Sequence, residues 1–158
     1  MTPKTYLKTF SILHYSIFAG LLIVASYIFS LDSNAALDLT PENDIFFYVV
    51  PALAVLGFIG SNIIFKAYLN SLTINNSLKG KLTGYQSASL IKYALIEAPA
   101  FLAIIMFMDE GNLYYMIIAG VLIAYFFMLR PTKEKIVNDL NLNMEHRVQF
   151  NKDDEILL

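Results

Sequence analysis

The sequence of 158 residues contains no cysteine, no tryptophan and only two histidines, His14 and His146. Without cysteine, disulfide bonds, thiolate nucleophiles and cysteine-ligated metals are excluded. The two histidines are too few for a multi-histidine metal site within one chain. The sequence also has no nucleotide-binding loop, metal-binding motif or nucleophilic triad. These absences predict a protein that is not an enzyme and that needs no cofactor.

Charged residues are scarce as well. They make up 15% of the chain, whereas hydrophobic residues make up 57%, and the mean hydropathy is +0.57. A soluble domain carries roughly 25% charged residues, and here the apolar residues fall in long blocks. The net charge of −2 comes without a basic patch, so no nucleic-acid partner is expected. The composition predicts an all-α integral membrane protein whose partner is the lipid bilayer.

Four apolar runs predict transmembrane helices at about residues 9–31, 45–66, 87–108 and 113–129. The last run is close to the lower limit of about 17 residues for a span. The apolar core of the first run, residues 10–29, exceeds the roughly 7–15 residues of a signal-peptide core, so we expect this helix to be retained. The prediction is an integral membrane four-helix bundle over residues 1–131, followed by a tail at 132–158.

The distribution of charge predicts the orientation of this bundle. All Lys and Arg residues fall on one side of the membrane, in the termini and in the loop after the second span, or at the membrane edge of that side. The loops after the first and third spans are acidic and contain no Lys or Arg. Because positive residues accumulate on the cytoplasmic side, the expected topology is multi-pass, N-in and C-in, in the cell inner (plasma) membrane.

A short amphipathic cytoplasmic helix is expected at the start of the tail, with Thr132 as its cap or Pro131 in its first turn. Ile136, Leu140 and Met144 are spaced four residues apart and would form one narrow apolar face. This helix could lie on the inner leaflet or cover the ends of the spans. The remaining polar residues are expected to be loosely ordered.

An acid lies inside the third predicted span. Glu97 comes two residues before Pro99, near mid-membrane, where ionisable groups are costly and usually face protein or water. We expect its carboxyl to be protonated, because apolar surroundings disfavour the charged form. Glu97 could carry a proton or cation, or it could be a neutral acid that is hydrogen-bonded to a neighbouring helix. Pro99 frees the carbonyl of Leu95, which would open a small polar pocket or merely kink the helix.

Further polar side chains lie at similar depth or nearer the cytoplasm. Together they could form a polar seam across the inner half of the bundle: His14, Tyr15, Ser16, Ser61, Asn62, Lys92 and Tyr93. Such groups can join helices through hydrogen bonds of about 0.6 kcal/mol each, or they can line a functional path. Lys92 is expected to extend toward the headgroups, and His14 to be a satisfied interfacial histidine. Small residues four apart, such as Gly57 and Ser61, mark expected helix contacts.

Residues 93–99, Tyr-Ala-Leu-Ile-Glu-Ala-Pro, resemble the carboxylate helix of the rotary ATP synthase c-subunit (proteolipid) family. In that family an Ala-Leu-Val/Ile-Glu-Ala run follows a cytoplasmic polar loop and holds the ion-carrying Glu, so the resemblance implies that Glu97 is an ion carrier. The glycine-rich first helix and the Arg-Gln-Pro loop of that family are missing. As a whole, including residues 129–135, the chain resembles small four-helix bacterial inner-membrane proteins, which implies no known activity.

Three functional hypotheses follow. The leading one is a small structural or accessory subunit of a larger membrane assembly, with other membrane subunits or further copies of the chain as partners. The second is a proton- or cation-translocating element that uses Glu97. The third is half of a dimeric small transporter, because a bundle of four short helices encloses little cavity volume.

Overall fold

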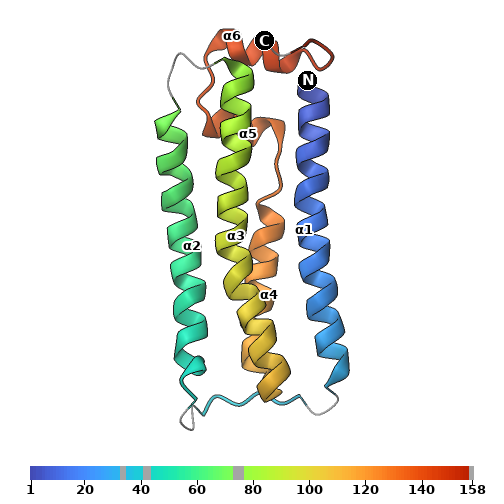
Figure 1. The fold of residues 1–158 in the computed structure, drawn as a ribbon, viewed down its shortest axis with the longest axis vertical. Coiled ribbons are helices and arrows are strands. Elements are labelled where there is room, and N and C mark those ends of the chain that lie inside the picture. Colours follow the sequence, from blue (N-terminus) through green and yellow to red (C-terminus); the bar gives the residue numbers. More distant parts are fainter. Residues whose placement is uncertain (33–34, 41–43, 73–76, 157–158) are drawn as a thin grey trace.

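The computed structural model describes residues 1–32, 35–40, 44–72 and 77–156. Parts of two predicted loops, residues 33–34, 41–43 and 73–76, therefore lie outside the described residues. The described part is helical apart from connecting segments and one isolated β-bridge. The helices are α1 (Pro3–Leu31), α2 (Phe46–Ser71), α3 (Leu78–Glu110), α4 (Leu113–Met128), α5 (Lys133–Asp139) and α6 (Met144–Asn151), as shown in Figure 1. The predicted all-α class is confirmed.

Three of these helices are long and apolar enough to cross a membrane: α1, α2 and α3. α4 has 16 residues and is about 24 Å long at 1.5 Å per residue, which is less than the ~30 Å of a hydrocarbon core. α5 follows α4 after a short break and is bent from it by 88°. The described chain thus has three candidate spans, or four if α4 and α5 count as one broken span.

α3 is the centre of the bundle and contacts α1, α2 and α4. In its most apolar stretch 44% of the residues are buried, compared with 17% in α1 and 11% in α2. The buried positions recur every three or four residues, as expected for a helix with one inward face: Tyr93, Ile96, Ala100, Ala103 and Phe107. The outer faces of α1 and α2 expose large apolar side chains, which is the kind of surface that lipid covers.

α2 and α3 approach each other closely at Gly57. A Cβ atom at this position would lie 2.5 Å from the carbonyl oxygen of Leu95 and 3.1 Å from Cγ of Pro99. The Leu95 carbonyl is the one that Pro99 cannot bind, and it points at the α2 backbone. The helix contact predicted at Gly57 is confirmed. The cavity beside Pro99 is lined by apolar side chains such as Leu53 and Leu102, so the polar pocket considered from the sequence is not formed there.

At the end of the bundle away from the chain termini (Figure 1), the α1–α2 loop is tied to the α3–α4 turn. Gly111 ends α3 with a φ of 65°, a conformation that glycine adopts without strain. The carbonyl of Ala36 accepts from the N–H of Leu113 at 3.0 Å. The side-chain amide of Asn112 exchanges two hydrogen bonds with the backbone of Asp38, at 3.1 and 2.9 Å. These contacts fix the two connections to each other.

α1 and α3 begin earlier than the predicted spans. The Thr2 hydroxyl accepts from the N–H of Thr5, and the Ser77 hydroxyl accepts from that of Gly80, each at 3.2 Å. These hydrogen bonds satisfy backbone donors that a helix start leaves free. Residues 78–83 are therefore helical, and the prediction of a polar loop there is wrong. The capped extensions carry both helices beyond their apolar stretches.

The tail folds into two helices rather than one helix and a loose remainder. α5 ends at Asp139, and Asn141 then adopts a positive φ of 45°. Met144 starts the separate helix α6 and is 79% exposed, so the predicted apolar face ending at Met144 is wrong. Ile136 of α5 and Phe150 of α6 are fully buried and belong to the hydrophobic core. The prediction of a loosely ordered remainder is likewise wrong, because α6 buries an aromatic ring.

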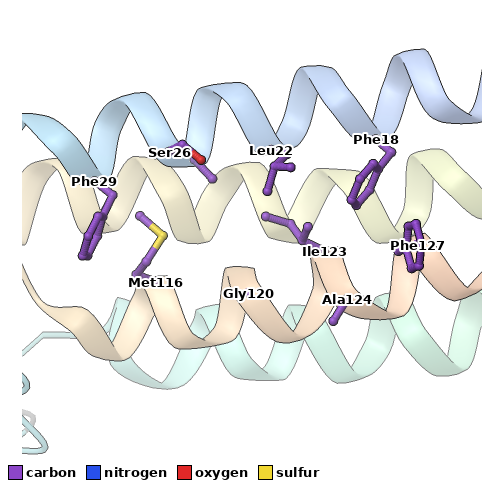
Figure 2. A pocket seen from close by; sticks show the side chains of 10 residues that line it. Phe18, Leu22, Ser26, Phe29, Met116, Gly120, Ile123, Ala124 and Phe127 are labelled. Atoms are coloured by element: carbon purple, nitrogen blue, oxygen red, sulfur yellow. The ribbon is translucent and has the colours of Figure 1, made fainter.

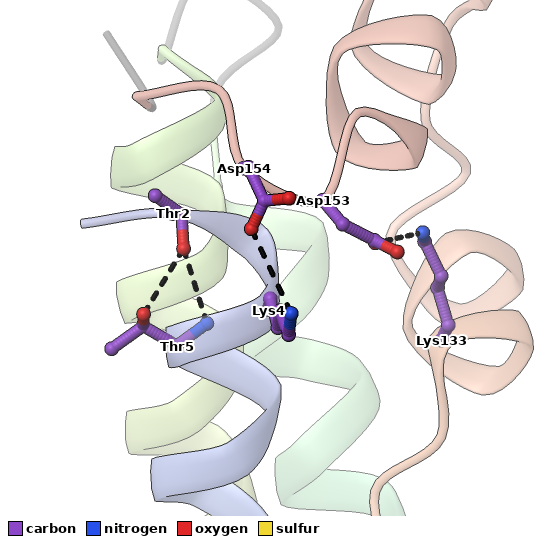
Figure 3. A network of polar contacts seen from close by, with 6 residues as sticks. All are labelled: Thr2, Lys4, Thr5, Lys133, Asp153 and Asp154. Carbon is purple, nitrogen blue, oxygen red and sulfur yellow. Dashed lines mark hydrogen bonds and ion pairs between the residues drawn. The ribbon is translucent and has the colours of Figure 1, made fainter.

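The tail is also held to the bundle by polar contacts, which Figure 3 shows near the start of α1. The backbone N–H of Lys4 donates to the carbonyl of Asp153 at 3.2 Å. Within the tail, the Lys133 ammonium lies 2.8 Å from the Asp153 carboxylate and fixes this segment to α5, and the pairing lowers the pKa of Asp153. Lys4 and Asp154 form a longer, exposed pair at 3.8 Å. The tail was expected either to lie on the inner leaflet or to cover the ends of the spans. In the structure it covers the ends of the long helices (Figure 1).

Candidate functional site

Asn62, Lys92 and Tyr125 form a polar cluster between α2, α3 and α4. The Lys92 ammonium donates to Asn62 Oδ1 at 2.7 Å. The Asn62 amide donates to the Tyr125 hydroxyl at 3.1 Å and to the carbonyl of Phe58 at 2.8 Å. Lys92 Nζ also lies 4.9 Å from the centroid of the Phe65 ring, within the range of a cation–π contact. Lys92 is therefore anchored inside the bundle and does not extend freely toward the headgroups.

This cluster lines one wall of a cavity of about 480 Å³. The cavity continues toward the chain termini, where Lys66 of α2 and Lys135 and Asp139 of α5 line it. Lys135 donates to the carbonyl of Met128 at 3.1 Å, and Asp139 accepts from the hydroxyl of Tyr85 at 2.9 Å. Three lysines and one carboxylate thus line the same space. Within the described part of the chain, none of these lysines is in an ion pair.

His14 lies deep in the bundle and is fully buried. Its ring stacks on Phe126, with centroids 5.1 Å apart, and is tilted against Tyr93 at the same separation. The backbone carbonyl of Phe127 approaches the imidazole, but neither ring nitrogen makes a hydrogen bond to a described residue. The expected satisfied interfacial histidine is therefore wrong, because aromatic packing, not hydrogen bonding, surrounds this ring.

The other predicted seam residues separate into buried and exposed groups. The Tyr93 hydroxyl donates to the carbonyl of Leu129 at 3.3 Å, and the Ser61 hydroxyl donates to the carbonyl of Phe58 at 3.0 Å. Both side chains are buried and serve as links between or within helices. Tyr15 and Ser16 are exposed on the outer face of α1. The structure thus brings Asn62 and Lys92 together with α4, and it leaves Tyr15 and Ser16 outside the cluster.

Glu97 is half-buried on α3. Its carboxyl makes no hydrogen bond or ion pair with any described residue, and nothing described connects it to the Asn62–Lys92–Tyr125 cluster. The exposed Ala94 and Ala98 lie one turn before it and next to it on the same helix. The alternative in which a neighbouring helix of this chain satisfies Glu97 is therefore not what the structure shows.

No family model, curated protein or solved structure matches this chain. The proposals below therefore rest on its own residues and their geometry. The resemblance of residues 93–99 to the ATP synthase c-subunit family, and of the whole chain to small inner-membrane proteins, stays a prediction.

Sequence reasoning named only Asn62 and Lys92 among the residues of this cavity, and it missed Lys66, Tyr125, Lys135 and Asp139. Tyr125 is one of several aromatic residues at the end of an apolar run, and nothing local distinguishes it. Lys135 and Asp139 lie in the tail, and α5 brings them to the same cavity as residues of α2 and α4. Only the 88° turn after α4 places these charges at the cavity, and that turn is not readable from periodicity.

The opposite end of the molecule has an acidic hollow of about 530 Å³, with Asp32, Asp38, Asp44 and Glu110 in its lining. Hydrogen bonds from the hydroxyl and the N–H of Thr40 lower the pKa of Asp38. Among the described residues, no three carboxylates or histidines are grouped so that they could hold a metal ion. The hollow is therefore an acidic surface at this end of the bundle.

An apolar groove of about 590 Å³ runs between α1 and α4. In Figure 2, Phe18, Leu22 and Phe29 of α1 face Met116, Ile123 and Phe127 of α4 across it. A Cβ atom on Gly120 would meet nothing within 4 Å, so the small residue deepens the groove and does not bring the helices together. The lining suits an acyl chain or an apolar helix and offers little to a polar substrate.

Proposed function

We propose that this protein is a non-enzymatic accessory subunit of a larger assembly in the bacterial inner membrane, and that its α3 face around Glu97 contacts a partner helix. In this proposal α1, α2, α3 and the shorter α4 all cross the membrane, and both termini are cytoplasmic. The charge distribution supports this orientation. The short α4 would be accommodated by local thinning of the bilayer or by a bent continuation into α5.

The observation that carries the proposal is the Glu97 carboxyl, which has no polar partner within the described chain. It lies in the apolar stretch of a candidate span. A polar group left without a hydrogen bond in hydrocarbon is costly, and acids at this depth normally face protein or water. A helix from a second subunit that donates or accepts one hydrogen bond would remove this cost.

The surroundings of Glu97 favour such a contact. Ala94 and Ala98 are exposed and four residues apart, the spacing that allows two helix backbones to approach closely in membranes. Ala98 also borders the shallow apolar hollow between α2 and α3, together with Gly57 and Leu102. Small residues beside an unsatisfied acid are the combination expected where another helix packs.

The same free carboxyl supports the alternative of a proton- or cation-translocating element, because an ion carrier must keep its acid available. It would also suit half of a dimeric small transporter, in which two copies enclose the acid. The hydrogen bonds within the described chain provide no relay from Glu97 to the polar cluster, so a carrier would also need an access path from its partner. The accessory role requires only that a partner helix contacts the α3 face around Glu97.

The test compares association of three single variants with that of the unaltered protein. Native membranes are gently solubilised after cross-linking, and companions and copy number are measured by native mass spectrometry. Ala98→Leu should reduce association by about tenfold, a loss of about 1.4 kcal/mol, because the larger side chain would keep the two helix backbones apart. Glu97→Gln should leave association unchanged, since the side-chain amide can donate and accept hydrogen bonds as a protonated acid does. The exposed Ala19→Leu on α1 is the control.

Two results would count against the proposal. One is an unaltered protein recovered as a monomer without companions, and the other is equal association of the Ala98→Leu and Ala19→Leu variants. Proton flux in reconstituted vesicles separates the alternative. Flux in the unaltered protein that is lost in Glu97→Gln, with association intact, would establish the carrier, because an amide cannot ionise near neutral pH.

A further inference from the structure

The cavity at the terminal end of the bundle has an excess of positive charge. Lys66, Lys92 and Lys135 line it together with the single carboxylate of Asp139. The two other lysines and Asp139 act electrostatically on Lys92, so the four groups are near neighbours. Asp139 is also occupied as a hydrogen-bond acceptor for Tyr85. One carboxylate cannot neutralise three ammonium groups, so the cavity retains a positive potential.

Neutral hydrogen-bonding groups hold two of the three lysines in place without neutralising them. Lys92 binds the side-chain carbonyl of Asn62, and Lys135 binds the backbone carbonyl of Met128. An ammonium group has three N–H donors, so each of these lysines has donors left for a ligand. The Tyr125 hydroxyl lies in the same lining. An anion with several acceptor oxygens would satisfy these donors and the excess charge together.

Apart from Asn70, the rest of the lining is apolar. Phe65, Leu69, Met128 and Leu129 line the same cavity, and Met128 is 70% exposed on the outer surface of the bundle. Asn62 and Asn70 bound the α2 side, so this wall covers about 12 Å at 1.5 Å per residue. A cationic wall that merges into an apolar outer surface suits a molecule with a phosphate at one end and hydrocarbon at the other.

We infer that this cavity binds the phosphate-bearing headgroup of a net-anionic phospholipid, inserted between α2, α4 and α5, with Lys66, Lys92 and Lys135 as its cationic ligands. The phosphate oxygens take the lysine donors, and the acyl chains leave along Met128 and Leu69. The soluble source of the same chemistry would be a free phosphate or phosphate monoester. A basic pocket at the cytoplasmic edge of spanning helices is a suitable place for an anionic headgroup.

The experiment uses the full chain in nanodiscs of phosphatidylcholine with increasing phosphatidylglycerol. Thermal unfolding and native mass spectrometry then report stabilisation and retained lipid. The test variant is the double substitution Lys66→Gln and Lys135→Gln, which leaves the more buried Lys92 untouched. Each lysine near an anionic headgroup strengthens binding about fivefold, so the double variant should need roughly 25-fold more phosphatidylglycerol for the same stabilisation.

The matched control is Lys79→Gln combined with Lys8→Gln, which removes the same charge from exposed residues of α3 and α1 outside the cavity. It should respond to phosphatidylglycerol as the unaltered protein does. Equal responses of the test and control variants would overturn the proposal, because the effect would then be general surface charge. In a third arm, glycerol phosphate and inorganic phosphate are added to phosphatidylcholine nanodiscs. Stabilisation by these ions at millimolar concentration would overturn the lipid assignment in favour of a soluble phosphate.

Discussion

At the scale of single residues, Gly57 controls how closely α2 and α3 pack. We expect Gly57→Ala to destabilise the bundle by about 1–3 kcal/mol, because the new methyl group would overlap the Leu95 carbonyl and force the backbones apart. That overlap is with rigid backbone at 2.5 Å, which no side-chain rotation relieves. The measurement is the unfolding free energy in mixed detergent micelles.

Gly60→Ala is the matched control for this substitution. It lies on the same helix, and its Cβ would meet nothing within 4 Å. Alanine is favoured over glycine within a helix by about 0.5–1 kcal/mol, so this control should be neutral or slightly stabilising. A Gly57 variant as stable as the Gly60 variant would mean that α2 and α3 can separate without loss.

The role of a single residue was predictable only where it depends on residues that are close to it in sequence. Glu97 and Lys92 stand out because a charge inside an apolar run is visible without a structure. The role of Lys92 is set by Asn62 on another helix, and that pairing depends on helix rotation. Tyr15 and His14 are adjacent in sequence, yet one is exposed and the other fully buried. A polar residue's depth can be read from its position in a span, but its direction cannot.

At the scale of elements, the tail is held by the Phe150 ring. We expect Phe150→Ala to release α6 from the bundle, since removing a buried phenylalanine costs about 3–5 kcal/mol and α6 has only eight residues. Limited proteolysis should then cut near Arg147 and Lys152 much faster, while the fragment containing α1 to α4 stays folded. The exposed Val148→Ala is the control, and identical cleavage rates in the two variants would contradict docking by Phe150.

The long helices were predictable as elements because apolar run length is a direct requirement of a bilayer. Their starts were not, since the capping hydroxyls of Thr2 and Ser77 lie in polar sequence outside the runs. The prediction for the tail was wrong for a related reason. Ile136, Leu140 and Met144 have helical spacing, but the positive φ of Asn141 interrupts the helix between the last two. Local spacing cannot reveal such a break.

At the scale of the whole molecule, the chain has a basic end and an acidic end. The lysine-lined cavity and both termini lie at one end, and the hollow with Asp32, Asp38 and Glu110 lies at the other. This polarity was foreseeable from the sequence, because it follows from the order of runs and charges alone. The cavity itself was not, since it requires α5 to fold back against α2 and α4 at the end of the bundle where the chain termini lie.

The same polarity predicts the orientation in the membrane. The chain has no cysteine of its own, so single cysteines can report position without background. Leu39→Cys, in the α1–α2 connection and 62% exposed, should react with a membrane-impermeant thiol reagent in intact spheroplasts. Lys79→Cys, exposed in the first turn of α3, should react only after permeabilisation, because positive segments stay in the cytoplasm. The reverse labelling pattern would invert the proposed topology. Labelling of both positions in intact cells would mean that α2 does not cross the membrane, since the sites before and after it would then share one aqueous compartment.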